Sequence, residues 1–467
     1  MNNNKKFKKF MTLAACIAVI GSTASPAFSD AITVSISAVA NGATGIISNQ
    51  NSSHTSTDYT WKKGATDSVE ANLTSGTLTI SNYSNSIVNG TLNATGGTIK
   101  LTSGVLTIGS DSTISSAILN QSYGSTLNIA GGSAYLSDSD SLEGEIVVSS
   151  GILGLDGAIL NDDLTITGGG VISDSNTVIN GTTTISGGSN DFNSTTFGNV
   201  SISDGTSSFT DVSKNGTFTQ TSGSTTIVGS GFDLNNDADN ISGGTLNIGN
   251  GSTTTVGVSA GTIGSDTTVN IDKNSTLNVS DGNISLDSGD TWNGNVNISG
   301  GELALIGISK KNSAKFTQTG GSTTITGNGF NLNNSSDSIL GGDLNIGNDT
   351  TTGNMAVSNG VLYEGANVTI NSGSSLDVAG GNVTLDGATD KWNGSVSNSG
   401  GTLTLKDVKK NSNGTFSQTD GNTTVTGTSF TMNNSADTIS GGTLNVGTST
   451  STGKLTVSSG SITEDAT

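Results

Sequence analysis

Acidic side chains are the residues of this chain best suited to chemistry. Paired carboxylates can cleave glycosidic bonds or bind calcium. They gather in three places: Asp138, Asp140, Glu143 and Glu145, then Asp162 and Asp163, then Asp237 and Asp239. The last group does not fit a calcium loop, because Asn240 stands where the loop needs Gly and Leu246 where it needs the closing Glu. We therefore predict solvated turn residues and no metal site, with calcium binding as the alternative.

Basic residues that could complete an active site are scarce. The 467 residues include no Arg, and His54 is the single His. Polysaccharide lyases built on β-helices depend on basic residues beside acidic ones, and Ser-His-Asp triads and multi-His metal sites need His at the site itself. We predict that the chain is not an enzyme, that it has no catalytic or cofactor-binding residues, and that His54 lies on the surface. A carbohydrate-active β-helix enzyme is the alternative.

Lysine recurs at one position of a long repeat. Lys310-Lys311 and Lys409-Lys410 occupy it in two copies, and Lys214 occupies it in an earlier copy. These side chains could form a series of cations for an acidic glycan. The simpler interpretation, which we adopt, is a solvated loop whose charge discourages edge pairing.

Phenylalanine recurs with the same spacing. Phe218, Phe316 and Phe416 could stack against sugars. Recurring aromatic residues more often fill the core of successive units, so we predict that all three are buried.

The elements that hold these residues form a tandem array. The tetrapeptide that begins at Phe218 returns at Phe316 and again at Phe416, and a Gly-Gly motif recurs as residues 243–249, 341–347 and 441–447. Long repeats built from shorter units are typical of stacked solenoids and not of one compact enzyme core.

The local pattern indicates short strands. Apolar and polar residues alternate in bursts such as residues 77–80, 126–129 and 295–298, and Gly, Asn, Asp or Ser bounds each burst. Such alternation is what a strand with one buried face requires. Gly is 67 of 467 residues, whereas charged residues are 12% and Pro is a single residue. The scarcity of Pro and of charge, together with the alternation, favours a folded β-protein over a disordered one.

The amino terminus has the features of a secretion signal. Four Lys precede an apolar stretch at residues 11–20, and small residues follow, with residues 27–29 the expected cleavage site. Residues 13–16 also fit a lipoprotein motif in which Cys16 would be lipidated, which we keep as the alternative. Cleavage leaves 13 Lys against 37 acidic residues, a net charge of −24. This charge disfavours nucleic acid as a partner.

These patterns together predict an all-β fold, a right-handed parallel β-helix after a helical signal peptide. We expect a signal peptide at 1–29, a cap at 30–70, divergent solenoid repeats at 71–195, and three repeats of about 100 residues at 196–467, the last truncated. The chain stops in mid-repeat at Thr467, so we expect a fragment of a longer protein. A coil of roughly 20–25 residues would give a rod on the order of 90 Å. Outward Thr and Ser can form hydroxyl ladders, and Asn can form amide ladders in turns.

The chain resembles the passenger region of bacterial autotransporters and related surface adhesins. The signal peptide, the absence of Cys from the mature part, and Gly/Ser/Thr-rich repeats such as residues 299–305 and 399–405 carry this resemblance. It implies a β-helical stalk displayed at the cell surface through an outer-membrane barrel, which would lie in a part absent from this chain.

The expected function is therefore that of an adhesin or structural rod that works through multivalent contacts. Its expected partners are glycans, host or neighbouring cell-surface molecules, or further copies of itself. A passive surface-layer or biofilm matrix protein is a further alternative.

Overall fold

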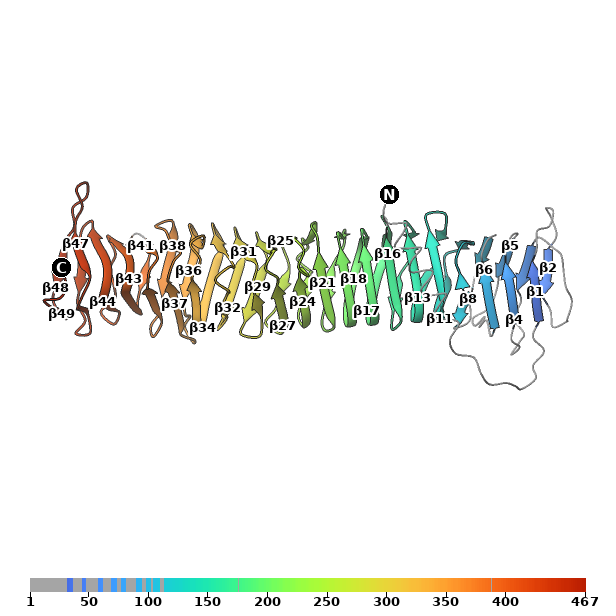
Figure 1. Ribbon diagram of the computed structural model, residues 1–467, viewed down its shortest axis with the longest axis horizontal. Coiled ribbons are helices and arrows are strands. Elements are labelled where there is room, and N and C mark those ends of the chain that lie inside the picture. The colour runs from blue at the N-terminus through green and yellow to red at the C-terminus, as the bar shows by residue number, and fades with distance from the viewer. Residues whose placement is uncertain are drawn as a thin grey trace.

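The computed structural model describes short strands between residues 32 and 109, then residues 113–467 apart from 175 and 388. The expected signal peptide, Cys16 and His54 lie outside the described residues. The strands of the described part stack in one line from β1 (Ile32–Ile36) at one end to β49 (Ser461–Ile462) at the other (Figure 1). In that part of the chain, no helix is long and apolar enough to cross a membrane.

Most strands between residues 113 and 439 bury every second side chain. In β28 (Ser275–Val279), Leu277 and Val279 point inward and are at most 1% exposed, whereas Thr276 and Asn278 point outward. The alternation seen in the sequence is therefore the alternation of a strand with one face on the core.

In the first long repeat three strands make one coil, and each coil repeats the path of the coil before it. β20 pairs in parallel with β23, β21 with β24, and β22 with β25.

We call the three stacks of strands face 1, face 2 and face 3. Over one long repeat, face 1 holds β20 (Phe218–Gln220), β23 (Asn240–Ile241), β26 (Thr262–Ile263), β29 (Asn283–Asp287) and β32 (Glu302–Ile306). Face 2 holds β21 (Ser224–Val228), β24 (Gly244–Ile248), β27 (Thr267–Ile271) and β30 (Thr291–Trp292). Face 3 holds β22 (Phe232–Leu234), β25 (Thr254–Val258), β28, β31 (Asn295–Ile298) and β33 (Phe316–Gln318). The predicted parallel β-helix is confirmed.

Coil length varies along the rod. Ile146 pairs with Leu164 of the next coil, whereas Asp343 pairs with Asn367. The coil that begins at Ile146 is thus shorter than the sequence led us to expect, because its turns contain fewer residues. About 18 coils at the usual strand spacing give a rod on the order of 90 Å.

Glycine permits the tight stacking of corners. Gly321 has φ +67°, and a Cβ atom there would lie 2.7 Å from the backbone of Gly300 in the coil before. Any other residue would therefore strain the backbone and push the coils apart.

Aromatic side chains fill the core of the long repeats. Phe218, Phe316 and Phe416 are fully buried, which confirms their predicted place. Phe316 lies edge-on to Phe330, with ring centroids 5.5 Å apart, and Trp292 lies 5.9 Å from both rings. Phe416 packs in the same way against Trp392 and Phe430.

Successive long repeats do not lie on the same face. Starting at Gln220, the chain comes back to the same position of face 1 once per coil, at Ile241, Ile263, Ile284, Leu303 and Thr323. Phe316 falls between the last two and pairs with Val296 of face 3. One long repeat therefore takes four and two-thirds coils. Each copy begins one face round the rod from the copy before.

The expected boundaries at residues 30, 71 and 196 stay predictions. In the part expected to be a cap, β1 pairs in parallel with β4 (Val69–Leu73), and β3 (Asp58–Trp61) with β5 (Thr77–Ile80). This is the same type of pairing as in the rest of the rod.

Candidate functional site

A buried lysine–aspartate pair is the most unusual group of polar residues in the rod. Lys310 Nζ lies 2.6 Å from Asp337 Oδ2, and both side chains are 0% exposed. Lys310 forms an isolated parallel β-bridge with Trp292, which lies on face 2 of the coil before. Like the side chain of Trp292, that of Lys310 points into the interior. A buried charge is strongly destabilising unless a counter-charge and hydrogen bonds compensate it.

The aspartate closes a turn as well as pairing with the lysine. Asp337 Oδ1 accepts a hydrogen bond from Phe316 N–H at 2.8 Å, one coil earlier. Its Oδ2 accepts another from Asn334 N–H at 2.9 Å, within its own turn. The carboxylate thus joins two coils through backbone donors that would otherwise lack partners. We call this arrangement a clasp.

The ammonium group is also fully hydrogen-bonded. Besides Asp337, Lys310 Nζ donates to the carbonyl oxygen of Ala314 at 3.1 Å and to Asn333 Oδ1 at 2.6 Å. These three acceptors match the three N–H bonds of the ammonium.

The same clasp occurs in each long repeat. Lys214 pairs with Asp239 at 2.5 Å, and Lys410 with Asp437 at 2.8 Å. The asparagine acceptor, Asn333 in the second copy, also recurs, because Lys214 donates to Asn235 and Lys410 to Asn433. We call these three groups the lysine-paired clasps.

The expected solvated loop is wrong for one lysine of each pair. Lys310 and Lys410 are buried, whereas their neighbours Lys311 and Lys409 are exposed. The reason is the period of two, since neighbouring residues of an extended segment point to opposite sides. The solvated loop is also wrong for Lys214, and the solvated turn residue is wrong for Asp239, because these two side chains form the buried ion pair of the first copy.

The sequence contains a signal for the clasp, which is missed when the acidic groups and the recurring lysines are considered separately. In each copy an Asp follows the buried Lys at nearly the same distance along the chain, as Asp239 follows Lys214 and Asp337 follows Lys310. That separation is one coil plus the turn that contains the Asp. A search for charged residues paired at this spacing would have found all three clasps.

Burial changes the chemistry of the lysine. Burial lowers the pKa of Lys310 from its ordinary value of 10.5, and the hydrogen bond and charge of Asp337 act in the opposite direction. The amine therefore loses its proton more readily than a lysine in water.

A second set of aspartates makes the same turn without lysine. Asp290 Oδ1 accepts from Val269 N–H and its Oδ2 from Asp287 N–H, each at 2.7 Å. Asp140 and Asp390 repeat this arrangement. Among the described residues, no lysine forms an ion pair with any of the three. We call them the lysine-free clasps.

The lysine-free clasps bind their protons more tightly than usual. Burial raises the pKa of Asp290 and of Asp390 from 3.8 to about 6. The backbone donors oppose this rise, and the charges of Asp287 and Asp386 add to it. Burial likewise raises the pKa of Asp140, a member of the first acidic group in the sequence.

The remaining acidic residues of the three groups do not converge. Asp138 and Asp237 are exposed, and Glu143 accepts a hydrogen bond from Asn161 at the surface. Within the described residues, no group of three or more His, Cys, Asp or Glu side chains is arranged to hold a metal ion.

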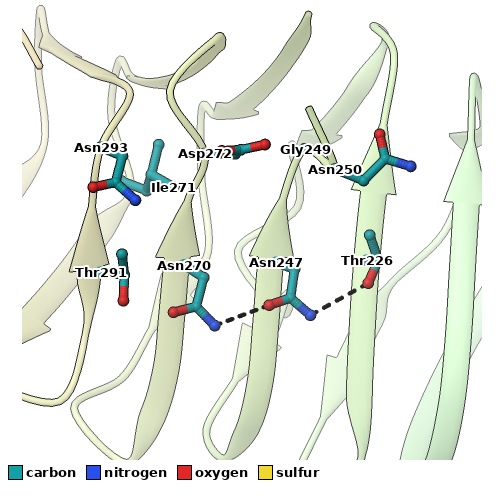
Figure 2. Close-up of a pocket in the computed structure, with 9 residues that line it drawn as sticks. All are labelled: Thr226, Asn247, Gly249, Asn250, Asn270, Ile271, Asp272, Thr291 and Asn293. Atoms are coloured by element: carbon teal, nitrogen blue, oxygen red, sulfur yellow. Dashed lines mark hydrogen bonds between the residues drawn. The ribbon is translucent and has the colours of Figure 1, made fainter. Parts of the chain in front are cut away.

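A shallow groove lined mainly by Asn and Thr residues runs along face 2. Its volume is about 400 Å³, and its floor is a line of side chains from successive coils: Thr226, Asn247, Asn270 and Thr291. Asn270 donates to Asn247 at 2.9 Å, and Asn247 donates to Thr226 at 3.2 Å, as Figure 2 shows. Asn250, Asp272 and Asn293 line one side of it. Amide ladders were expected in turns, whereas this one lies on the outward side of strands.

The groove has no copy of the same composition in the next repeat. Asn345 corresponds to Asn247 and lies on face 1, where its neighbours along the stack are Thr369 and then Lys391. A lysine thus replaces Thr291, and a threonine replaces Asn270.

Comparison with protein-family models, with curated proteins and with solved structures finds no match for this chain.

Proposed function

We propose that this chain is the exported, surface-displayed part of an autotransporter-like protein and acts as an adhesive rod. Its target is a repetitive glycan. The fold supports this proposal because a stack of about 18 coils makes a long, stiff surface with little interior for a deep pocket. The signal-like amino terminus supports export.

The observation that carries the proposal is the regular polar array on face 2. One outward line of side chains contains Thr206, Ser224, Thr245 and Thr268, and the next contains Ser208, Thr226, Asn247, Asn270 and Thr291. Neighbouring groups in a line are one strand spacing apart, about 4.8 Å. A polymer with regularly spaced hydroxyl groups can therefore make the same weak hydrogen bond many times, and the contacts add through avidity.

The test is binding of the mature chain to insoluble polysaccharides, measured by co-sedimentation. Asn247→Ala combined with Asn270→Ala should weaken binding about tenfold, because avidity multiplies the loss of each hydrogen bond. Asn345→Ala is the matched control, since it occupies the equivalent position on another face. Equal binding by both variants would remove face 2 as the contact surface.

Two other outcomes would contradict the proposal. Release of soluble sugar from the polysaccharide would identify an enzyme. Self-association of the purified chain with no polysaccharide binding would identify a matrix protein. Export is tested separately, by fusing residues 1–29 to a periplasmic reporter and measuring its activity.

A further inference from the structure

The lysine-paired clasps contain the three groups needed for an amide-forming reaction. A buried amine, an amide carbonyl and a carboxylate meet at one point in each long repeat. Lys310 Nζ contacts Asn333 Oδ1 at 2.6 Å and Asp337 Oδ2 at 2.6 Å. Neither contact is needed for the backbone ladder, and the same triad recurs with Lys214 and with Lys410.

We propose that Lys310 and Asn333 form an intramolecular isopeptide bond, and that Lys214 with Asn235 and Lys410 with Asn433 do the same. The inference concerns the covalent structure of the rod and is independent of what the rod binds.

The distances place the reacting atoms close together. The side-chain carbonyl bond of Asn333 is about 1.2 Å long, so its Cγ lies within about 3.8 Å of Lys310 Nζ. Attack requires about 3–3.5 Å and an approach above the amide plane, which a small rotation of the Asn333 side chain provides. Because the ammonium is a donor, the oxygen and not the nitrogen of the amide must face it.

Asp337 is placed to move the proton. Its Oδ2 accepts from Lys310, so it can take a proton from the ammonium and leave a neutral amine. The amine then attacks Asn333 Cγ, forming the N–C bond. Asp337 returns the proton to Asn333 Nδ2, the C–N bond to that nitrogen breaks, and ammonia leaves. Asp337 also takes the second proton from the attacking nitrogen and passes it to the departing ammonia. One ammonium and one primary amide become one secondary amide and one ammonium ion, with no oxidant or reductant.

The leaving group faces outward. Asn333 Nδ2 donates to Asn312 Oδ1 at 2.7 Å, and Asn312 is exposed. Ammonia can therefore reach solvent, while the bond itself forms beside buried groups. The product would join two residues 23 apart, so each coil that contains the lysine would be tied to the next.

The experiment is mass spectrometry of tryptic peptides from the purified full chain after it has folded. We expect a branched peptide that contains both Lys310 and Asn333 and is lighter by about 17 Da than its two parts. We also expect no cleavage after Lys310. Complete recovery of the two separate peptides would overturn the proposal.

Two variants test which group reacts. Asn333→Ala removes the electrophile and keeps the buried ion pair, so it should fold and lose the branched peptide at this site alone. Asn345→Ala, a control in the same repeat, should keep it. A branched peptide that persists in Asn333→Ala and is lighter by about 18 Da would show that Lys310 reacts with Asp337 and releases water. That result would overturn the choice of Asn333.

Discussion

The lysine-paired and lysine-free clasps use one carboxylate geometry in two electrostatic settings. Asp337 and Asp290 each accept one backbone N–H from the preceding coil and one from their own turn. Asp337 has in addition a buried ammonium at 2.6 Å, whereas the pKa of Asp290 rises to about 6. The comparison teaches that two backbone donors suffice to hold a turn but do not fully compensate the charge of a partly buried carboxylate.

The largest loss of stability is expected when a lysine-paired clasp loses its counter-charge. Asp337→Asn leaves the Lys310 ammonium buried without its counter-charge, which should cost about 3–5 kcal/mol. Because solenoids can open locally, hydrogen exchange at the Phe316 amide is the appropriate measurement. The matched change Asp290→Asn should cost about 1 kcal/mol, read at the Val269 amide, since it removes no ion pair. Equal losses at the two sites would contradict the distinction.

A second variant should convert a lysine-paired clasp into a lysine-free one. Lys310→Met keeps the volume of the side chain and removes its charge. Protection of the Phe316 amide should then decrease as pH rises, because a charged Asp337 would lie buried without its counter-charge. A protection factor that does not change between pH 5 and pH 7 would show that the backbone donors alone hold the charge.

The lysine-free clasps should themselves make the rod more stable in mild acid. The pKa of Asp290 and of Asp390 is raised from 3.8 to about 6 in the folded chain. A carboxyl whose folded pKa is raised contributes stability that is complete below pH 3.8 and is lost as pH rises through about 6. Urea unfolding at a series of pH values should show this decrease. The double variant Asp290→Asn and Asp390→Asn should remove that part of the pH dependence, whereas wild-type behaviour in the variant would exclude these groups as its source.

The smallest effect is expected at a surface ion pair. Lys406 contacts Glu364 at 3.0 Å and Asp386 at 3.2 Å, but its side chain is 43% exposed. Hydrogen bonds to Glu364 and Asp386 raise its pKa. Solvent and salt screen such pairs, so Lys406→Ala should leave the urea midpoint unchanged at high salt. A clear loss of stability at high salt would mean that exposed pairs matter as much as buried ones in this rod.

Local pattern was sufficient to predict much of the fold. The alternation in segments such as residues 295–298 predicted strands with one buried face, and the recurrence of Phe218 as Phe316 and Phe416 predicted buried core positions. Both depend only on neighbouring residues and on repetition, which a sequence contains in full.

The partners of charged residues were not predicted. Lys310 and Asp337 are distant in the sequence, and the length of a coil decides whether such residues meet. Coils differ in length along the rod, as the pairings of Ile146 with Leu164 and of Asp343 with Asn367 show, because their turns differ in length. The length of a coil by itself therefore does not predict the contact, and only the recurrence of the Lys–Asp separation in the three copies indicates it.

The sequence alone determined that this chain is a repetitive β-structure with short strands and an apolar interior. Only the tertiary structure decided that a long repeat spans four and two-thirds coils, so that equivalent residues such as Phe218 and Phe316 lie on different faces. It also decided that Lys310 lies inside while Lys311 lies outside. The physical reason is that alternation is a property of the local backbone, whereas the face a residue occupies depends on the total number of residues in all the turns before it.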